Sequence, residues 1–328
     1  MPSRDPIIIV AGQTAVGKTD LAMGIAESIE GGGECISADS MQIYRGMDIG
    51  TAKPTARQRQ QVRHHMIDVA NPHDSGFTLA TWLQGARESI EDVFSRGRRP
   101  IVVGGTNLYI KSLLSGFIDG TEPDPARRAE LDRMDTEQLR TMLESRDPES
   151  AQRIHRNDRR RTIRAIEVFD STGKPISALQ EHWQSESGPD PFILVGLSMD
   201  RELLNRRINS RVGRMMEEGL LQELEQLLQD GPLGRQAREA VGYKQLLEMM
   251  EGRCSLEEAR EQIKIQSRRY ARQQATWLKR FRPLQNSIWL DMNQGNPDEQ
   301  LRSCIDLIAR SEKSLDSAPP EGDQASQI

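Results

Sequence analysis

The stretch IIIVAGQTAVGKTDLAMGIAESI, residues 7–29, constrains the fold of this chain more than any other. An isoleucine-rich run leads into the pattern G-x-x-x-x-G-K-[ST], formed by Gly12, Gly17, Lys18 and Thr19, and a helical pattern follows. A loop of this kind turns backbone N–H groups toward an anion at a helix N-terminus. Strand, loop and helix in this order therefore predict a site for linked phosphates.

The composition excludes several classes of protein. The chain has 328 residues and a formal net charge of −5, which argues against a uniformly basic nucleic-acid binder but leaves room for a local basic face. Its three cysteines, Cys35, Cys254 and Cys304, are far apart, so we predict neither a disulfide framework nor a CxxC metal site. No apolar run approaches about 18 residues, and the first strand begins where a signal peptide would lie. We therefore expect a soluble, cytoplasmic protein with no membrane segment.

Apolar runs separated by helical patterns predict where the strands and helices lie. Strands are expected at Ile7–Ala11, Cys35–Ala38, Met66–Val69, Pro100–Val103, 192–199 and 288–292. Helices are expected at 18–29, 78–95, 201–216, 237–250 and 256–281. Strands that alternate with helices favour a parallel sheet, so we predict an α/β fold with a P-loop NTPase-like core.

The character of the chain changes in its middle. From 121 to 188 the sequence is helix-rich, dense in arginine and nearly free of strand signals. We therefore predict a helical insertion at 121–188 between a first core part, 1–120, and a second, 189–311, that includes C-terminal helices. The last residues, 312–328, are polar and lack periodicity, which predicts a disordered tail.

A second motif, ISADSMQIYRGMDIGTAKPT at 36–55, begins in the second predicted strand. Asp39 follows that strand directly, at the edge of an open α/β sheet where ligands bind. Its carboxylate could there be a Mg²⁺ ligand or a general base. The alternative is a helix cap or a turn residue, since aspartate also favours these positions. The residues by themselves leave these readings open.

Taken together, the motifs resemble those of the tRNA dimethylallyltransferases, also called tRNA isopentenyltransferases, of the IPP transferase family. The similarity covers roughly residues 6–292, in family order. Three residues depart from the family pattern: Gln13 replaces a proline, Asn107 a glycine, and Arg156 the proline of IHPND. The matching stretches are GQTAVGKT, DSMQIYRGMDIGTAKP, HHMIDV, VVGGTNLYIKSLLSG, RIHRNDRRRTIRAIEVF, GLSMDRELLNRRINSRVGRMMEEGL, EAVGYKQ and RRYARQQATWLKRF.

This resemblance implies a reaction in which N6 of an adenine attacks C1 of dimethylallyl diphosphate and diphosphate leaves. The leaving group gathers negative charge, so the site needs cations and preorganised donors. By resemblance, the catalytic residues are Asp39, the base that accepts the N6 proton, together with Lys18, Thr19 and Arg211. From sequence alone Arg211 fits a solvated helix face equally well. The donor's diphosphate is expected on Gly12, Gln13, Thr14, Ala15, Val16, Gly17, Lys18 and Thr19, with a Mg²⁺ cofactor on Thr19.

The resemblance also implies that the acceptor is the anticodon stem-loop of a tRNA, bound by a monomer. Two arginine-rich runs, 153–164 and 268–280, are either ordinary solvated faces or tracks for the phosphate backbone, and the presence of both favours tracks. The target base has to leave its stack to reach Asp39. The expected RNA contacts are Asp39, Ser40, Met41, Gln42, Thr106, Arg128, Arg160, Arg161, Thr162, Ile163, Arg164, Glu239, Ala240, Val241, Gly242, Tyr243 and Lys244.

Other functions fit parts of the sequence. A small-molecule kinase shares the P-loop but usually has an apolar strand that ends in a metal-binding Asp. The strand IVVGGT has no such carboxylate, which argues against a kinase. Asp68 in the strand-like run MIDV could supply one, so the kinase alternative stays open. A prenyltransferase that acts on free AMP has no need of the arginine-rich insertion. A non-catalytic RNA-binding protein leaves Lys18, Thr19 and Asp39 unexplained. We expect no ATP hydrolysis in the reaction, and weak binding of ATP to the same loop, as a competitor of the prenyl donor, would be compatible with this interpretation.

Two further groups of residues have competing interpretations. His64, His65 and His73 could suggest a metal site, but no cysteine or carboxylate cluster has matching spacing, so we expect core or turn histidines. Tyr44 and Met47 lie close to Asp39 in the sequence and either line a prenyl pocket or pack in the core.

Overall fold

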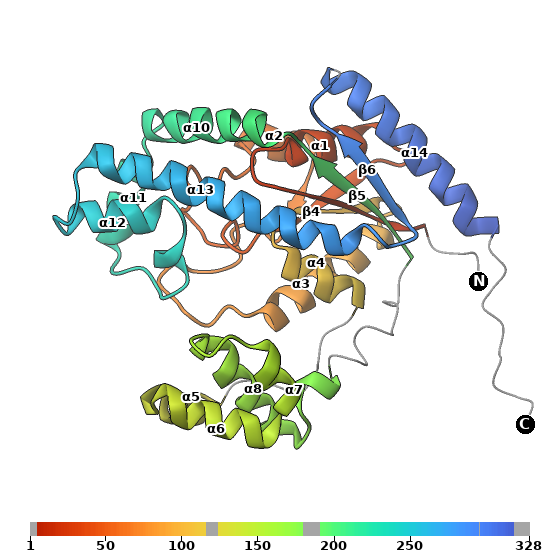
Figure 1. The fold of residues 1–328 in the computed structure, drawn as a ribbon. Coiled ribbons are helices and arrows are strands. Elements are labelled where there is room, and N and C mark those ends of the chain that lie inside the picture. Colours follow the sequence, from red (N-terminus) through yellow and green to blue (C-terminus); the bar gives the residue numbers. More distant parts are fainter. Residues whose placement is uncertain (1–4, 116–123, 180–190, 295, 318–328) are drawn as a thin grey trace, which may run out of the picture. The chain divides into compact units, whose positions relative to one another are not determined.

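The computed structural model describes residues 5–115, 124–179, 191–294 and 296–317. Contacts within the chain divide it into two units: 1–110 with 190–328, and 111–189. The first unit contains every strand of the described residues, and the second is built from helices (Figure 1). The predicted insertion, 121–188, falls inside the second unit.

The sheet of the first unit is parallel throughout, in the order β3-β2-β4-β1-β5-β6. The central strand is β1, in which Val10 pairs with Val103 on one side and Val195 on the other. Parallel strands are covered on both faces, which explains why these runs are almost wholly apolar. The predicted α/β fold is confirmed. The strands are β1 Ile7–Gly12, β2 Gly33–Ala38, β3 His64–His65, β4 Arg99–Gly104, β5 Phe192–Ser198 and β6 Ser287–Asp291.

Helices cover both faces of this sheet (Figure 1). On one face α1 (Lys18–Ser28) lies beside α14 (Pro297–Ser317), and α3 (Leu79–Ser95) covers the other. Trp82 of α3 donates its indole N–H to the carbonyl of Ser37 at 3.0 Å, which fixes α3 against β2. The other helical elements between 56 and 281 outside the insertion are α2 Ala56–Gln61, α4 Asn107–Ser115, α10 Arg201–Glu217, α11 Leu220–Gln229, η1 Ala237–Glu239, α12 Tyr243–Met250, α13 Leu256–Leu278 and η2 Lys279–Phe281.

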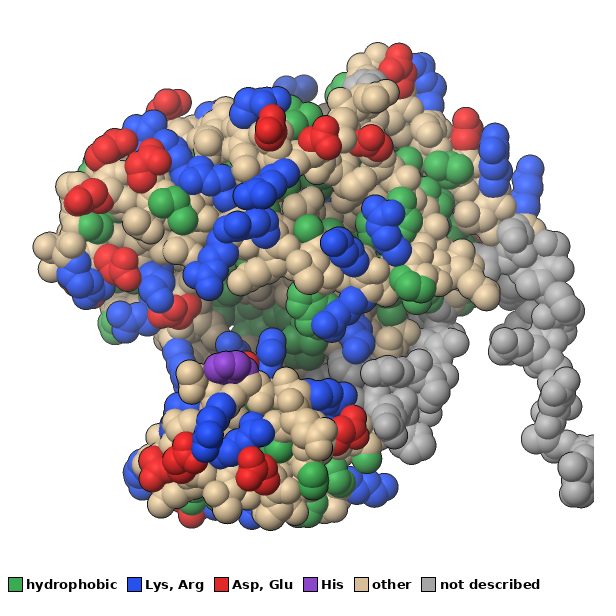
Figure 2. Space-filling view, viewed as in Figure 1, with side chains coloured by type: hydrophobic (Ala, Val, Ile, Leu, Met, Phe, Trp, Pro, Cys, Tyr) green, Lys and Arg blue, Asp and Glu red, His purple; other side chains and the backbone are tan. Residues whose placement is uncertain are grey.

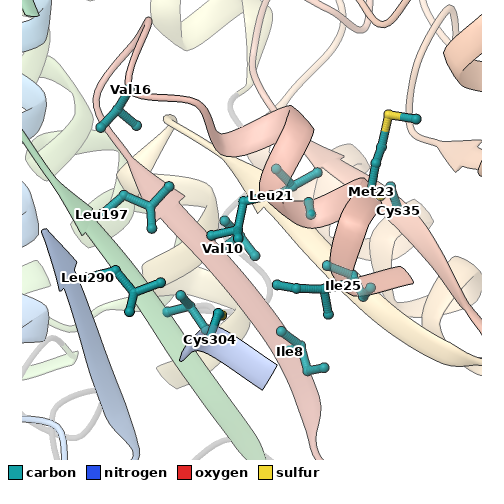
Figure 3. Close-up of a cluster of buried hydrophobic side chains, with 14 of the residues drawn as sticks. Ile8, Val10, Val16, Leu21, Met23, Ile25, Cys35, Leu197, Leu290 and Cys304 are labelled. Carbon is teal, nitrogen blue, oxygen red and sulfur yellow. The ribbon is translucent and has the colours of Figure 1, made fainter. Parts of the chain in front are cut away.

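The larger hydrophobic core lies between the sheet, α1 and α14 (Figure 3). Ile8 and Val10 of β1 are buried with Leu21 and Ile25 of α1 and with Cys304 of α14. Burial raises the pKa of the Cys304 thiol to about 12, so this cysteine acts as a small apolar residue. Because α1 is held along its buried face, its N-terminus has a fixed position at the carboxyl end of β1.

The second unit is a small helical domain with its own core. Its helices are α5 (Pro125–Arg133), α6 (Thr136–Arg146), α7 (Pro148–Arg153) and α8 (Arg159–Thr172). Asp147 both caps α7, by accepting from the Ser150 N–H at 2.9 Å, and accepts from the Ser177 hydroxyl at 2.7 Å. The core is formed by Leu131, Leu139, Leu143, Ala151, Ile163, Ala165 and Ile166.

One predicted strand is wrong. The run Met66–Val69 is not extended, because Met66 and Asp68 both adopt φ 59°, in the left-handed region. The short strand β3 instead lies just before it, at His64–His65. Asp68 is held out of the sheet by ion pairs with Lys53 and Arg59, at 2.5 and 2.8 Å. Asp68 therefore does not end a sheet strand, where a kinase would carry its metal-binding aspartate.

Two helix predictions also need correction. The helix expected at 237–250 is broken at Gly242, where φ is 105°, so that η1 and α12 are separate. The intervening helix α11 (Leu220–Gln229) was missing from the sequence prediction altogether. At the C-terminus α14 continues to Ser317, so the disorder predicted for 312–317 is wrong, while 318–328 lie outside the described residues. A search of the described residues for a helix long and apolar enough to cross a membrane finds none.

Candidate active site

The loop between β1 and α1 has the backbone form that binds phosphate. Gly17 adopts φ 107°, which glycine alone accepts without strain, and α1 begins at the next residue. No side chain of the described residues caps this helix, so the N–H groups of its first turn lack a capping partner. Gly12 is also constrained, since a Cβ there would lie 2.8 Å from Cγ1 of Val16.

Two cations lie at this loop. The Lys18 ammonium donates to the Gln13 carbonyl at 2.7 Å, and the Arg211 guanidinium of α10 donates to the Thr14 hydroxyl at 3.1 Å. Burial lowers the pKa of Lys18 to about 8, with Asp39 opposing this shift and Arg211 adding to it. Burial also lowers the pKa of Arg211, again with Asp39 opposing. Arg211 therefore contacts the phosphate loop and is not an ordinary solvated residue of a helix face.

A cavity of about 900 Å³ opens beside this loop, and residues from several parts of the first unit line it. Lys18 and Thr19 line it from the loop and α1, Asp39 from the end of β2, and Arg211 from α10. All four residues predicted to be catalytic thus share one cavity. The remaining wall comes from the segment 48–56 and from Tyr270 and Gln274 of α13.

Asp39 occupies the end of β2 as a turn residue. Its Oδ1 accepts the N–H of Met41 at 2.8 Å and of Gln42 at 3.3 Å. Among the described residues none donates a hydrogen bond to the other carboxylate oxygen, Oδ2. One oxygen of Asp39 therefore forms a turn, as the alternative interpretation predicted, and the other stays available in the cavity wall. The side-chain amide of Gln42, another predicted RNA contact, donates to the backbone carbonyls of Thr51 and Ala52 at 3.3 Å each.

Thr106 lies next to Asp39 because the strands β2 and β4 meet closely at their carboxyl ends. A Cβ on Gly104 would lie 2.1 Å from the carbonyl oxygen of Ala38, so only glycine fits there. The turn that follows brings the Thr106 hydroxyl 3.0 Å from the Ser40 N–H, from which it accepts a hydrogen bond. Thr106 thus fixes the backbone directly after Asp39.

The segment after Asp39 is held by a carboxylate that the sequence analysis missed. Glu223 of α11 accepts the backbone N–H groups of Asp48, Ile49 and Gly50 at 2.8, 2.7 and 3.2 Å. The sequence did contain a signal, since Glu223 falls on the buried face of α11 that also carries Leu220, Leu224 and Leu227. A charged residue on an apolar face is worth noting because it needs a partner.

Lys53 anchors the other end of this segment. Its ammonium group is almost fully buried and donates to the Tyr44 carbonyl at 2.6 Å, to Asp48 at 2.7 Å and to Asp68 at 2.5 Å. A buried cation requires such complete pairing. Lys53 is therefore committed to structure, whereas Lys18 and Arg211 each donate a hydrogen bond to a residue of the phosphate loop.

The helix α13 contacts the phosphate loop, and two departures from the family pattern take part. Gln13 donates its amide to the carbonyl of Ala271 at 3.0 Å, and Asn107 donates to that of Gln274 at 3.4 Å. The Thr14 N–H, expected to bind phosphate, instead donates to the side chain of Gln274 at 2.8 Å. The backbone donors left for an anion therefore begin at Ala15.

The predicted RNA contacts on the insertion divide into exposed and buried residues. Arg160 and Arg161 are exposed at the start of α8. Thr162 and Ile163 are buried, at 3% and 2% exposure, so their side chains are not available to an RNA surface. Helix geometry explains this, because residues two further along point to the opposite face. Arg128 and Arg164 lie beside the buried carboxylate of Glu167, at 2.6 and 3.9 Å.

The predicted anticodon-loop segment, 239–244, is also partly buried. Tyr243 is 0% exposed and donates its hydroxyl to Glu223 at 2.6 Å, and Ala240 and Gly242 are buried as well. The exposed pair Glu239 and Lys244 bond to each other at 2.6 Å. The side chain of Tyr243 therefore supports the cavity wall and does not lie on the surface.

Basic side chains gather over α10 and α13 on the face of the first unit that Figure 2 shows. Arg206, Arg207 and Arg214 of α10 are exposed and line the cavity. On α13, Arg269 and Arg272 are exposed. The guanidinium of Arg280 lies 4.6 Å from the ring centroid of Trp277. The run 268–280 is thus a mixed surface of arginine and aromatic residues.

His64 and His65 are both engaged by other groups of the protein. His65 bonds to the buried carboxylate of Glu34 at 2.7 Å, and Nδ1 of His64 lies 2.7 Å from the Val62 carbonyl. Among the described residues no group of three or more His, Cys, Asp or Glu side chains could hold a metal ion. Tyr44 and Met47 are 1% and 0% exposed and pack in the core, so they do not line the cavity.

Residues 42–281 match the family model described as IPP transferase. A tRNA dimethylallyltransferase of Bacillus cytotoxicus is 44% identical over 308 residues, which cover 92% of this chain and 95% of the relative. One of Thermomicrobium roseum is 42% identical over 331 residues, which cover 99% of this chain and 96% of the relative.

Solved structures agree with these relatives. The full-length tRNA isopentenylpyrophosphate transferase from Bacillus halodurans superposes with a TM-score of 0.71 at 37% identity, covering 95% of this chain and 98% of that one. A eukaryotic dimethylallyltransferase acting on tRNA gives a TM-score of 0.81 at 27% identity, covering 98% and 82%. The chain described here belongs to the IPP transferase family.

Proposed function

We propose that this protein transfers the dimethylallyl group of dimethylallyl diphosphate to N6 of an adenine next to the tRNA anticodon, at position 37. The products are diphosphate and N6-dimethylallyladenosine. One observation carries the proposal: Asp39 lines the same cavity as Lys18 and Arg211 and interacts electrostatically with both. A base for the acceptor and two cations for the leaving group are thus combined in one site.

The donor's diphosphate binds in the loop from Gly12 to Thr19, on the backbone N–H groups from Ala15 onward, with Lys18 and Arg211 beside them. As the bond between C1 and the diphosphate oxygen breaks, negative charge grows on the leaving group. Lys18 and Arg211 stabilise that charge, and because burial removes water from both side chains, their attraction to an anion is weakly screened. Arg211 also offers two parallel N–H donors, which suit a phosphate group.

Asp39 accepts the proton of the acceptor amine. The lone pair of an adenine N6 is delocalised into the ring, so the amine becomes a useful nucleophile only as its proton is removed. General-base assistance of this kind contributes about 10²–10⁴-fold. The free oxygen Oδ2 of Asp39 is the acceptor, while Oδ1 keeps the turn.

Mg²⁺ fits this site as an ion that arrives with the diphosphate. Thr19 presents a hydroxyl in the cavity wall, and Mg²⁺ commonly takes few protein ligands together with phosphate oxygens and water. When bound, the ion would supply further positive charge to the leaving group. Thr19 is the residue that would hold it.

The tRNA is held by basic side chains outside the phosphate loop. Exposed arginines on α8, at 160 and 161, and on α13, at 269 and 272, offer contacts to the RNA backbone. The target base leaves its stack to enter the cavity.

The test supplies unmodified tRNA and dimethylallyl diphosphate with all nucleotides removed. Diphosphate release and the mass of the tRNA nucleosides are then measured. We expect both products in equal amount, with no need for ATP and no transfer to free AMP. Product that appears only when ATP is added, or prenylation of AMP at a rate comparable to tRNA, would overturn the proposal.

A further inference from the structure

Gln274 joins two loops that belong to different substrates of the proposed reaction. It is 4% exposed, in the second half of α13. Its Oε1 accepts the Thr14 N–H in the phosphate loop at 2.8 Å, and its Nε2 donates to the Gly105 carbonyl at 3.0 Å. The orientation of the amide is fixed, because the reverse orientation would bring two donors together at Thr14 and two acceptors together at Gly105.

The contact continues from Gly105 to the proposed base. Thr106 follows Gly105 and accepts the Ser40 N–H at 3.0 Å, and Ser40 follows Asp39. Tyr270, one turn before Gln274, also lines the cavity, and its neighbours Thr106 and Gln274 partly oppose the rise in its pKa that burial causes. A chain of hydrogen bonds thus connects the loop for the leaving group with the residue proposed to deprotonate the acceptor.

The fit around Gln274 is tight. A Cβ added to Gly105 would lie 2.3 Å from Nε2 of Gln274, so this approach requires glycine. Asn107 donates to the backbone carbonyl of Gln274 at 3.4 Å, and Gln13 to that of Ala271 one turn earlier at 3.0 Å. Three side-chain amides therefore bind α13 to the carboxyl ends of β1 and β4. Both polar atoms of the buried Gln274 amide are hydrogen-bonded, and a buried amide with both atoms paired specifies one geometry.

We propose that Gln274 is a positioning residue that sets the phosphate loop and Asp39 at a fixed separation, so that the leaving group and the base act on correctly aligned substrates. This inference rests on the proposed function. In a displacement, a misalignment of about 1 Å between the reacting groups can cost about 10²-fold in rate. Gln274 touches neither reacting atom, so it acts through the loops that it joins.

Gln274→Met keeps the length of the side chain and removes both polar atoms. With both substrates saturating, we expect its single-turnover transfer rate to fall by about 10–100-fold. The dissociation constants of dimethylallyl diphosphate alone and of tRNA alone should change by less than about threefold, because each site keeps its own contacts. Gln274→Glu retains the bond to Thr14 and loses the donor to Gly105, so it should show the same kind of loss. The matched control is Gln262→Met, on the exposed face of the same helix, which should transfer like the wild type.

A double-variant measurement distinguishes a role in aligning the phosphate loop with Asp39 from a role in supporting the phosphate loop alone. Thr106→Val removes the next link, so the double variant with Gln274→Met should be little slower than the slower single variant. A saturating rate close to wild type overturns the inference. So does a loss seen only as weaker donor binding, or loss of folding in both Gln274 variants, since Gln274 would then be a structural support. Wild-type transfer is measured first, and its absence would instead count against the proposed function.

Discussion

Tyr243 donates its hydroxyl to Glu223 at 2.6 Å, and the same carboxylate accepts three backbone N–H groups of the segment that begins at Asp48. Burial raises the pKa of Tyr243, and the adjacent carboxylate of Glu223 raises it further, so the phenol remains a donor. Gly50 lies against the tyrosine ring, because a Cβ there would be 2.5 Å from it. This pair therefore holds one wall of the cavity.

Tyr243→Phe is expected to lower the free energy of unfolding by about 1–3 kcal/mol, because it leaves the half-buried carboxylate of Glu223 one donor short. Glu223→Gln should cost at least as much, since it removes the charge that accepts three backbone bonds. Urea denaturation measures both changes. Glu225→Gln, exposed on the same helix, serves as the control and should stay within about 0.5 kcal/mol of wild type. Equal stabilities for Tyr243→Phe and the control would contradict the structural role assigned to this pair.

Asp39→Asn should lose most transfer while it keeps the turn, because the amide oxygen can still accept the Met41 N–H. The expected loss is about 10²–10⁴-fold in the single-turnover rate. Binding of tRNA and of the donor should persist, as neither depends on proton transfer. The measurement is rapid-quench formation of prenyl-adenosine with enzyme in excess. A rate within about threefold of wild type would rule out Asp39 as the base.

Donor affinity is expected to fall as the pH rises above about 8. Lys18 has a pKa of about 8 in the empty site, and a bound diphosphate favours its charged form and raises that pKa. Binding above pH 8 therefore takes up a proton, so affinity should drop by up to about tenfold for each pH unit there. Below pH 8 the lysine is already charged, and this contribution disappears.

Calorimetric titration with dimethylallyl diphosphate in buffers of different ionisation enthalpy measures this proton uptake. Lys18→Arg supplies the control, because a guanidinium stays charged throughout this range. An affinity for the wild type that is flat between pH 7 and about 9.5 would mean that Lys18 does not face the diphosphate.

Charge reversal at Arg160 and Arg161 should weaken tRNA binding and reduce its dependence on salt. Each lost phosphate contact lowers the slope of log K against log salt by roughly 0.7–0.9. Affinity for the prenyl donor should stay unchanged, since the phosphate loop lies in the other unit. Filter binding at several salt concentrations tests this, with Arg302→Glu on the exposed side of α14 as the control. An unchanged slope would make these arginines an ordinary solvated surface.

The sequence predicted those parts of the site that depend on local pattern. The phosphate loop and Asp39 could be found because each follows directly after an apolar strand. The prediction of a strand at Met66–Val69 was wrong because an apolar pattern does not reveal backbone conformation. Met66 and Asp68 adopt left-handed φ angles, and Asp68 pairs with Lys53. That pairing depends on residues 15 positions apart, which no local pattern records.

The residues that were missed share one property. Glu223 and Gln274 are polar side chains on the buried faces of amphipathic helices, among Leu224 and Leu227 in one and Ala271 and Leu278 in the other. From hydrophobic periodicity alone, such a position looks like a polar interruption of an apolar face and is not recognised as a specific contact. Apart from Tyr243, their partners in these hydrogen bonds lie at least 169 residues away, so the sequence can flag them as unusual but cannot name what they bind.

The contact between Gln13 and Ala271 has a consequence for how the protein is made, since it joins residues 258 positions apart. A ribosome adds about 5–20 residues per second, so the phosphate loop emerges roughly 10–50 s before α13 can reach it. During that interval the nascent chain carries the loop without Gln274, without Arg211 for much of the time, and without the strands β5 and β6. A chain released early would therefore carry the phosphate-loop motif without the residues that complete the cavity around it.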